Sequence, residues 1–141
     1  DLYKHLPQNY TTFTYKKDDC CYVRDNNRLN QYLSLFCNLF DNELALLPDI
    51  KAEMLNPKSR GFIGNFIDIT KNGEEIIIDP LYVSDPLKYR ITINKENLLE
   101  LINTWFTLNE QKVPIIIVKQ EQDRIIMYEG EKNTLNITER E

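Results

Sequence analysis

The sequence is poor in the residues that most catalytic and metal sites need. Its 141 residues include one histidine, His5, together with four glycines and three cysteines. A histidine-activated serine or cysteine nucleophile would have to use His5, and a structural zinc site needs about four cysteine or histidine ligands at finger-like spacing. Gly61 and Gly64 lie in a strand pattern and lack the Lys-Ser/Thr of a phosphate loop. We therefore expect no enzyme activity, no metal and no cofactor.

Positive charge and long apolar runs are also scarce. Lys and Arg number 17 against 22 Asp and Glu, for a net charge of -5. Because nucleic-acid affinity depends largely on cations that neutralise phosphates, this composition disfavours nucleic acid as a partner. The longest aliphatic runs, Ile76–Ile78 and Ile115–Val118, are far shorter than the roughly 20 residues of a membrane span. No signal-peptide pattern opens the chain, so we expect a cytoplasmic protein without a membrane segment.

The three cysteines do not form a disulfide framework. Cys20 and Cys21 are adjacent, with Cα atoms about 3.8 Å apart, which is below the usual disulfide range. A bond from either of them to Cys37 remains geometrically possible. Reduced thiols in a cytosol are the better interpretation.

What the sequence does contain is the patterning of a single α+β domain, 1–141. Residues 1–25 are irregular or hold two short strands, Thr11–Tyr15 and Cys21–Val23; an ordered coil on the helices is the alternative. Residues 26–56 are helical, because apolar residues recur at a spacing of three and four. These residues are Leu29, Tyr32, Leu33, Phe36, Leu39 and Phe40.

Residues 61–129 have the order β-β-β-α-β-β, and 130–141 form a polar tail. The expected strands are 62–69, Ile76–Ile78, Tyr89–Ile93, Ile115–Val118 and Arg124–Tyr128. Asn72-Gly73 predicts a hairpin, and Asn94 caps a helix that runs to about Asn109 with Trp105 in the core. We expect N-terminal helices packed on a mostly antiparallel sheet, in the order α-α-β-β-β-α-β-β. Whether Ile115–Val118 is a buried centre or a self-pairing edge is left open.

Carboxylates and one aromatic residue gather on and after the second of these strands, where Pro80 and Pro86 stiffen the chain. A tyrosine supplies apolar area with a polar tip, and carboxylates steer a basic partner. We therefore predict a partner-binding surface here. Its residues are Glu74, Glu75, Asp79, Tyr82 and Asp85. The alternative is a plain connection, with Tyr82 packed on the sheet edge and a solvated acidic face.

The segment YRITINKENLLELINTWFTLNEQKVPIIIVKQEQDRIIMYE, residues 89–129, contains in order a strand, an Asn-capped Leu-rich helix with a central Trp, an Ile-rich strand and a charged hairpin. This pattern resembles small bacterial immunity proteins of contact-dependent growth inhibition and related polymorphic-toxin systems. The resemblance implies a non-catalytic cytoplasmic protein that binds and neutralises one cognate toxin domain. Many such toxins are nucleases with basic clefts. The resemblance transfers no binding residue to this chain.

The sequence is compatible with three functions. The first is an immunity protein that blocks a basic toxin cleft with the five residues named above. The second is a non-catalytic adaptor or subunit that binds another protein, for example through an exposed strand edge. The third is a small hydrolase with paired carboxylates, which would need a concave pocket with convergent Asp or Glu. The oligomeric state is left open.

Overall fold

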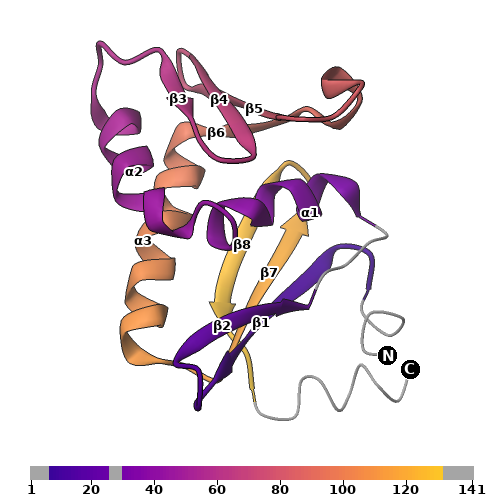
Figure 1. Ribbon diagram of the computed structural model, residues 1–141, viewed down its shortest axis with the longest axis vertical. Coiled ribbons are helices and arrows are strands. Elements are labelled where there is room, and N and C mark those ends of the chain that lie inside the picture. Colours follow the sequence, from indigo (N-terminus) through magenta and orange to yellow (C-terminus); the bar gives the residue numbers. More distant parts are fainter. Residues whose placement is uncertain (1–6, 26–29, 132–141) are drawn as a thin grey trace.

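Two four-stranded antiparallel sheets, with helices between and beside them, make up the fold (Figure 1). The computed structural model describes residues 7–25 and 30–131. Sheet A has the order β2 (Cys21–Asp25), β1 (Tyr10–Lys16), β7 (Ile115–Glu121), β8 (Arg124–Glu129). Sheet B has the order β3 (Gly61–Ile63), β4 (Ile67–Asn72), β5 (Glu75–Pro80), β6 (Ile91–Asn94).

The helical segments connect and cover these sheets. They are α1 (Gln31–Phe36), the 3₁₀ helices η2 (Cys37–Phe40) and η3 (Leu44–Leu46), α2 (Leu47–Leu55), η4 (Pro86–Tyr89) and α3 (Lys95–Gln111). In Figure 1, sheet B lies above α1 and sheet A below it, while α3 runs down one side from β6 to β7.

The predicted element order is wrong. Helices do not open the chain: β1 and β2 precede them and pair with each other, and β1 also pairs with β7. The strands were also expected in one sheet, whereas they form two. Strand β1 is bonded on one side by β2 and on the other by β7, about 100 residues later, and no local signal reports the contact with β7.

Ile115–Val118 is a buried centre. β7 lies between β1 and β8, and its first four residues are all buried. A strand that is covered on both faces has apolar residues at successive positions. This explains why apolar and polar residues do not alternate in Ile115–Val118.

The β4–β5 hairpin confirms the turn predicted from Asn72-Gly73, with a shift of one residue. Asn72 pairs with Glu75, so the two central residues are Gly73 and Glu74. Gly73 has φ 63°, a conformation that glycine adopts without the steric penalty of a side chain. Tight two-residue hairpin turns often have a glycine at the first of their two central positions.

The strand expected over 62–69 is split by a turn at Gly64–Phe66. The cause is Glu43, whose buried carboxylate accepts the backbone N–H groups of Asn65 (2.8 Å) and Phe66 (3.3 Å). Because these two N–H groups bond Glu43, they do not continue a strand ladder. Two short strands, β3 and β4, therefore replace one long one.

The long helix α3 matches its prediction. The Asn94 side chain accepts from the N–H groups of Glu96 (2.9 Å) and Asn97 (3.4 Å). Asn caps helices in this way because its oxygen satisfies donors that have no partner within the helix. Helix α1 begins later than the helical range predicted from residue 26: Asn30 is its cap, and residues 26–29 lie outside the described residues.

One core joins the two sheets. Trp105, as predicted, is buried, with its ring 5.0 Å from Phe13 of β1 and 5.1 Å from Phe40 of η2. The same apolar cluster includes isoleucines of sheet B such as Ile69 and Ile76. The two sheets therefore share a hydrophobic core instead of each having its own.

Candidate functional site

The five predicted partner-binding residues lie at two ends of strand β5. Glu74 and Glu75 lie at the hairpin that begins the strand, whereas Tyr82 and Asp85 follow its last residue. Six residues of strand separate the two ends by about 17 Å. The structure thus divides the predicted surface instead of gathering it.

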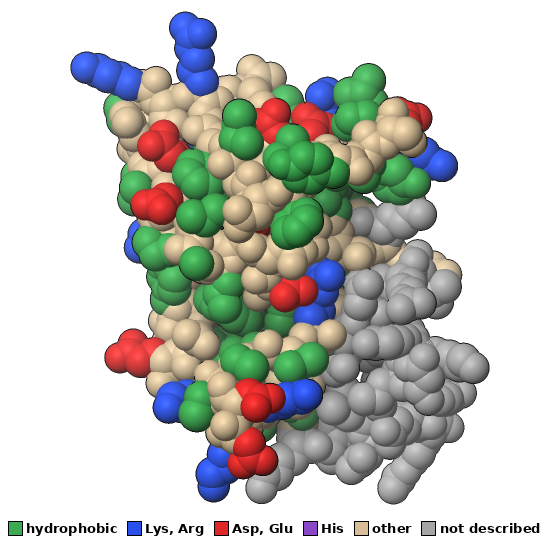
Figure 2. Space-filling view, viewed as in Figure 1, with side chains coloured by type: hydrophobic (Ala, Val, Ile, Leu, Met, Phe, Trp, Pro, Cys, Tyr) green, Lys and Arg blue, Asp and Glu red, His purple; other side chains and the backbone are tan. Residues whose placement is uncertain are grey.

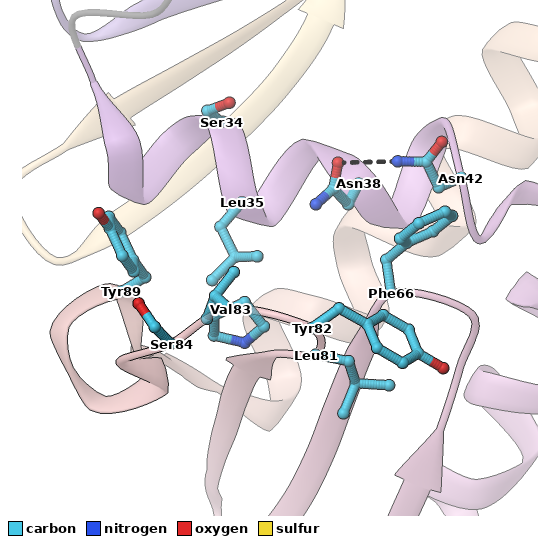
Figure 3. Close-up of a pocket in the computed structure, with 11 residues that line it drawn as sticks. Ser34, Leu35, Asn38, Asn42, Phe66, Leu81, Tyr82, Val83, Ser84 and Tyr89 are labelled. Carbon is cyan, nitrogen blue, oxygen red and sulfur yellow. Dashed lines mark hydrogen bonds between the residues drawn. The ribbon is translucent and has the colours of Figure 1, made fainter.

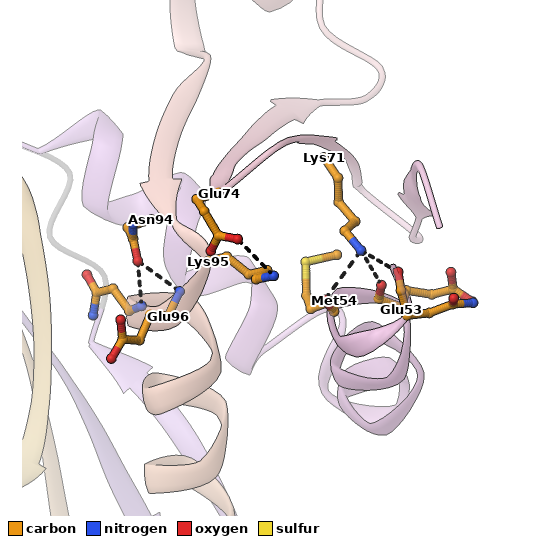
Figure 4. A network of polar contacts seen from close by, with 9 residues as sticks. Glu53, Met54, Lys71, Glu74, Asn94, Lys95 and Glu96 are labelled. Atoms are coloured by element: carbon orange, nitrogen blue, oxygen red, sulfur yellow. Dashed lines mark hydrogen bonds and ion pairs between the residues drawn. The ribbon is translucent and has the colours of Figure 1, made fainter. Parts of the chain in front are cut away.

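The glutamate end is occupied by contacts within the chain (Figure 4). Glu74 lies 3.2 Å from Lys95 at the start of α3, although its side chain is 70% exposed. On the neighbouring strand, the Lys71 ammonium caps the C-terminal end of α2. It donates to the carbonyls of Glu53 (2.9 Å) and Asn56 (2.6 Å). Glu75 is exposed. The contacts of Glu74 and Lys71 hold sheet B against α3 and α2.

Asp79 forms a bidentate ion pair with Arg90. Arg90 donates from Nε and from its second guanidinium nitrogen to the two carboxylate oxygens, at 2.7 and 3.1 Å. The bond to Asp79 raises the pKa of the Arg90 guanidinium. The Asp79 side chain is only 14% exposed, so its oxygens are taken up by Arg90.

Tyr82 and Asp85 are the exposed members of the predicted set at the other end of β5. Tyr82 is 86% exposed, and its backbone has φ 61°, a region that non-glycine residues rarely adopt. Its ring stands edge-on to Phe66, with the centroids 6.4 Å apart. Asp85 precedes η4, and its side chain makes no capping bond there. Tyr82 does not pack flat on the sheet edge, as the alternative interpretation required.

A groove of about 790 Å³ opens beside Tyr82, between α1–η2 and the segment after β5 (Figure 3). We call it the Tyr82 groove. Its lining residues are Ser34, Leu35, Asn38, Asn42, Phe66, Pro80, Leu81, Tyr82, Val83, Ser84 and Tyr89. In Figure 3 the rings of Phe66 and Tyr82 lie together at one end, and Tyr89 lies at the other.

Two asparagines supply the polar side of this groove. The Asn38 side-chain oxygen accepts from the Asn42 amide (3.2 Å) and from the Arg24 guanidinium (3.5 Å). An oxygen with two donors fixes the orientation of the amide. The Asn38 NH₂ group therefore points away from Asn42, as Figure 3 shows, and can donate to an occupant of the groove.

Sequence reasoning identified Tyr82 but missed the rest of the groove. The sequence predicted Phe66 within a continuous strand over 62–69, and it gave Asn38 no role beyond its place in the helical range 26–56. Only Ser34 and Asn38, four residues apart, carried a local signal, since that spacing places them on one helical face. Nothing local indicated that Phe66 and Val83 would meet that face.

The groove is lined by neutral side chains. Among its lining residues there is no carboxylate, histidine, cysteine or lysine to move a proton. Within the part of the chain that the structure describes, no group of three or more His, Cys, Asp or Glu could hold a metal ion. Cys37 lies nearby on η2, but burial raises the pKa of its thiol to about 12, so it stays protonated at neutral pH. The groove offers an occupant shape, apolar contact and amide donors.

His5 lies outside the described residues, as does 132–141 of the predicted tail. Among the helices of residues 7–25 and 30–131, none has the length and apolar character needed to cross a membrane. No family model, no curated protein and no solved structure matches this chain.

Proposed function

We propose that this chain is a non-catalytic, cytoplasmic immunity-type protein that binds a toxin domain through the Tyr82 groove. One observation carries the proposal: exposed apolar side chains concentrate around this groove. Nine large hydrophobic residues are exposed in the described part of the chain, and three of them line this groove. These three are Phe66, Tyr82 and Val83.

Such a concentration favours a protein partner. Figure 2 shows hydrophobic side chains on the part of the surface that sheet B and its neighbouring loops form, with carboxylates among them. Scattered exposed hydrophobics are normal, but a contiguous group with polar surroundings is typical of an interaction site. Aromatic anchors contribute most of the binding energy in such interfaces.

Tyr82 suits the role of an anchor because it is already positioned. Its contact with Phe66 and its left-handed backbone hold the ring away from the body. A residue in this conformation gives up about 1–2 kcal/mol of stability. A side chain ordered before binding loses less conformational entropy when the partner arrives.

The charge of the chain favours a basic partner. Asp85 is exposed beside the groove, Glu74 and Glu75 are exposed at the far end of β5, and the net charge is -5. Carboxylates at these positions speed the encounter with a basic surface such as a nuclease cleft, and the apolar groove then determines how slowly the complex dissociates. Asp79 acts indirectly, by holding Arg90.

The first prediction tests this assignment with the product of the neighbouring upstream gene as the candidate toxin. We expect the full chain to bind that product, abolish its activity and protect a growing culture. Tyr82→Ala should weaken binding about 30-fold in calorimetry, the loss of a central aromatic anchor. Leu55→Ala is the matched control, because Leu55 is an exposed apolar residue at the end of α2, away from the groove.

Two further comparisons separate the alternatives. Asp85→Lys should slow association and increase its salt dependence, whereas Asp49→Lys on α2 should not. Equal binding by the Tyr82→Ala variant and the unmodified chain would remove the groove from the proposal. A tight complex with a domain that is harmless by itself would replace the immunity function with that of an adaptor or subunit.

A further inference from the structure

The four outer strands of the two sheets differ in how their free edges are closed. An edge strand of an antiparallel pair presents the N–H and C=O groups of every second residue to the outside. Those groups attract a further strand unless something bonds them. The outer strands here are β2 and β8 of sheet A and β3 and β6 of sheet B.

A side chain closes the edge of β8 near its start. Asn97 of α3 donates from its amide nitrogen to the carbonyl of Ile125 (2.8 Å) and accepts the Ile125 N–H on its oxygen (3.0 Å). Asn97 is buried, so this pair of bonds places α3 against the strand.

Side chains also bond the edges of sheet B. The Tyr32 hydroxyl donates to the carbonyl of Thr92 on β6 (2.9 Å). On β3, the Gly61 N–H donates to the Ser59 hydroxyl, and that hydroxyl lies 3.2 Å from the Gly61 carbonyl, to which it donates. Three of the four outer strands therefore carry a bonded backbone group.

Strand β2 is different. Tyr15 of β1 donates its N–H to Pro114, so the odd-numbered residues of β1 bond toward β7 and the even-numbered ones toward β2. In the observed register, Val23 faces Thr14 and bonds inward. The backbone groups of Tyr22 and Arg24 therefore point outward, and in residues 7–25 and 30–131 no hydrogen bond to them is present.

We propose that two copies of this chain pair through their β2 strands, antiparallel, with a twofold axis at Val23. Tyr22 of each copy then exchanges both backbone hydrogen bonds with Arg24 of the other, which satisfies all the outward groups. The two copies of sheet A become one eight-stranded sheet. This surface is separate from the Tyr82 groove and does not depend on the function proposed for it.

The side chains at β2 are compatible with self-pairing. The axis places Tyr22 opposite Arg24, so no like charges face each other in that pair. The charge of Arg24 is also met within its own copy, by Asp41 at 3.6 Å. Val23 is 37% exposed and meets its own copy at the axis, where a β-branched side chain packs well.

The pairing surface is small. Five residues per copy provide less area than the roughly 800 Å² per partner of a standard interface. The dimer should therefore form and dissociate with concentration, and dilution should yield monomers.

Sedimentation velocity of the full chain under reducing conditions, from about 5 to 500 µM, tests this directly. The unmodified chain should shift from monomer toward dimer as concentration rises. Val23→Glu and Val23→Lys each place two like charges at the axis, and each should weaken association at least about tenfold. Val23→Thr, a neutral strand former, should associate like the unmodified chain. An equimolar mixture of Val23→Glu and Val23→Lys should form dimers again, because opposite charges then meet.

The mixture also controls for folding, since two misfolded variants would not rescue each other, and far-ultraviolet circular dichroism of each variant checks the fold independently. A chain that stays monomeric over the whole range overturns the proposal. So does a Val23→Glu variant that associates as well as the unmodified chain, because the dimer would then use another surface.

Discussion

Glu43 shows how a single buried charge shapes its neighbourhood. Its side chain has no solvent exposure, and both carboxylate oxygens accept backbone N–H groups from the turn between β3 and β4. Gly64 leaves the room for this contact, because a Cβ built there would lie 1.8 Å from a Glu43 oxygen. A buried carboxylate is tolerated when hydrogen bonds replace its water.

We predict that Glu43→Ala lowers the free energy of unfolding by about 3 kcal/mol, because two N–H groups lose their charged acceptor. Gly64→Ala should be destabilising as well, since the added methyl group displaces the carboxylate. Urea unfolding measures both. Glu110→Ala, at an exposed position of α3, is the control and should stay within about 0.5 kcal/mol of the unmodified chain. A Glu43→Ala variant as stable as that control would contradict this role.

Trp105, unlike Glu43, buries a polar group that has no hydrogen-bond partner among the described residues. This group is its indole N–H. The rings of Phe13, Tyr22 and Phe40 surround the indole at 5.0 to 5.2 Å. The unmet N–H costs about 1–3 kcal/mol, and the burial and ring contacts of a large aromatic side chain offset it.

At the scale of elements, the first turn of α3 uses two asparagines for different tasks. Asn94 caps the helix, and Asn97, three residues later, bonds the free edge of β8 at Ile125. The first task follows from the sequence, because a capping residue acts within its own helix. The second needs β8 to be in place and carries no local signal.

We predict that Asn97→Ala lowers the free energy of unfolding by about 2–3 kcal/mol, since it leaves a buried N–H and C=O without partners. Asn103→Ala, at an exposed position of the same helix, should change it by less than about 0.5 kcal/mol. Thermal and urea unfolding of both variants give the comparison. Equal stability of the two variants would mean that the N–H and C=O of Ile125 on β8 find other hydrogen-bond partners when Asn97 is removed.

The helices illustrate which elements sequence patterns predict well. α3 has a cap, a long amphipathic repeat and a clear end, all within about 20 residues, and its prediction is confirmed. The apolar residues from Tyr32 to Phe40 have the same spacing, yet among the described residues of that stretch α-helix covers Gln31–Phe36 and a 3₁₀ helix, Cys37–Phe40, follows. The apolar spacing alone does not distinguish these two kinds of helix.

At the scale of the whole molecule, the shared core has a thermodynamic consequence. Both sheets contribute to one apolar cluster, so neither can lose its packing without exposing the other. We predict a single cooperative unfolding transition. Fluorescence of Trp105, the one tryptophan in the chain, and far-ultraviolet circular dichroism should give the same urea midpoint. Two separated midpoints would show that the sheets unfold independently.

The candidate site also belongs to this scale. The segment from Glu74 to Asp85 is continuous in sequence, which suggested one surface, but a strand runs through it and carries its two ends apart. The Tyr82 groove instead combines α1–η2, the turn before β4 and the loop after β5. Sequence proximity was therefore a poor guide to the surface, although Tyr82, one of the five predicted residues, lines the groove.

The sequence by itself determined the local features of this protein: the capped helix α3, the hairpin at Gly73, the presence of a strand at Ile115–Val118 and the α+β class. Each depends on contacts within a few residues or on apolar periodicity, which the chain displays directly. The tertiary structure alone decided that β1 joins β7, that the strands divide into two sheets, and that Glu43 breaks a strand at Gly64. It also decided which residues meet at the Tyr82 groove. These outcomes depend on hydrogen bonds and packing between distant segments, whose energies appear only once the chain has folded.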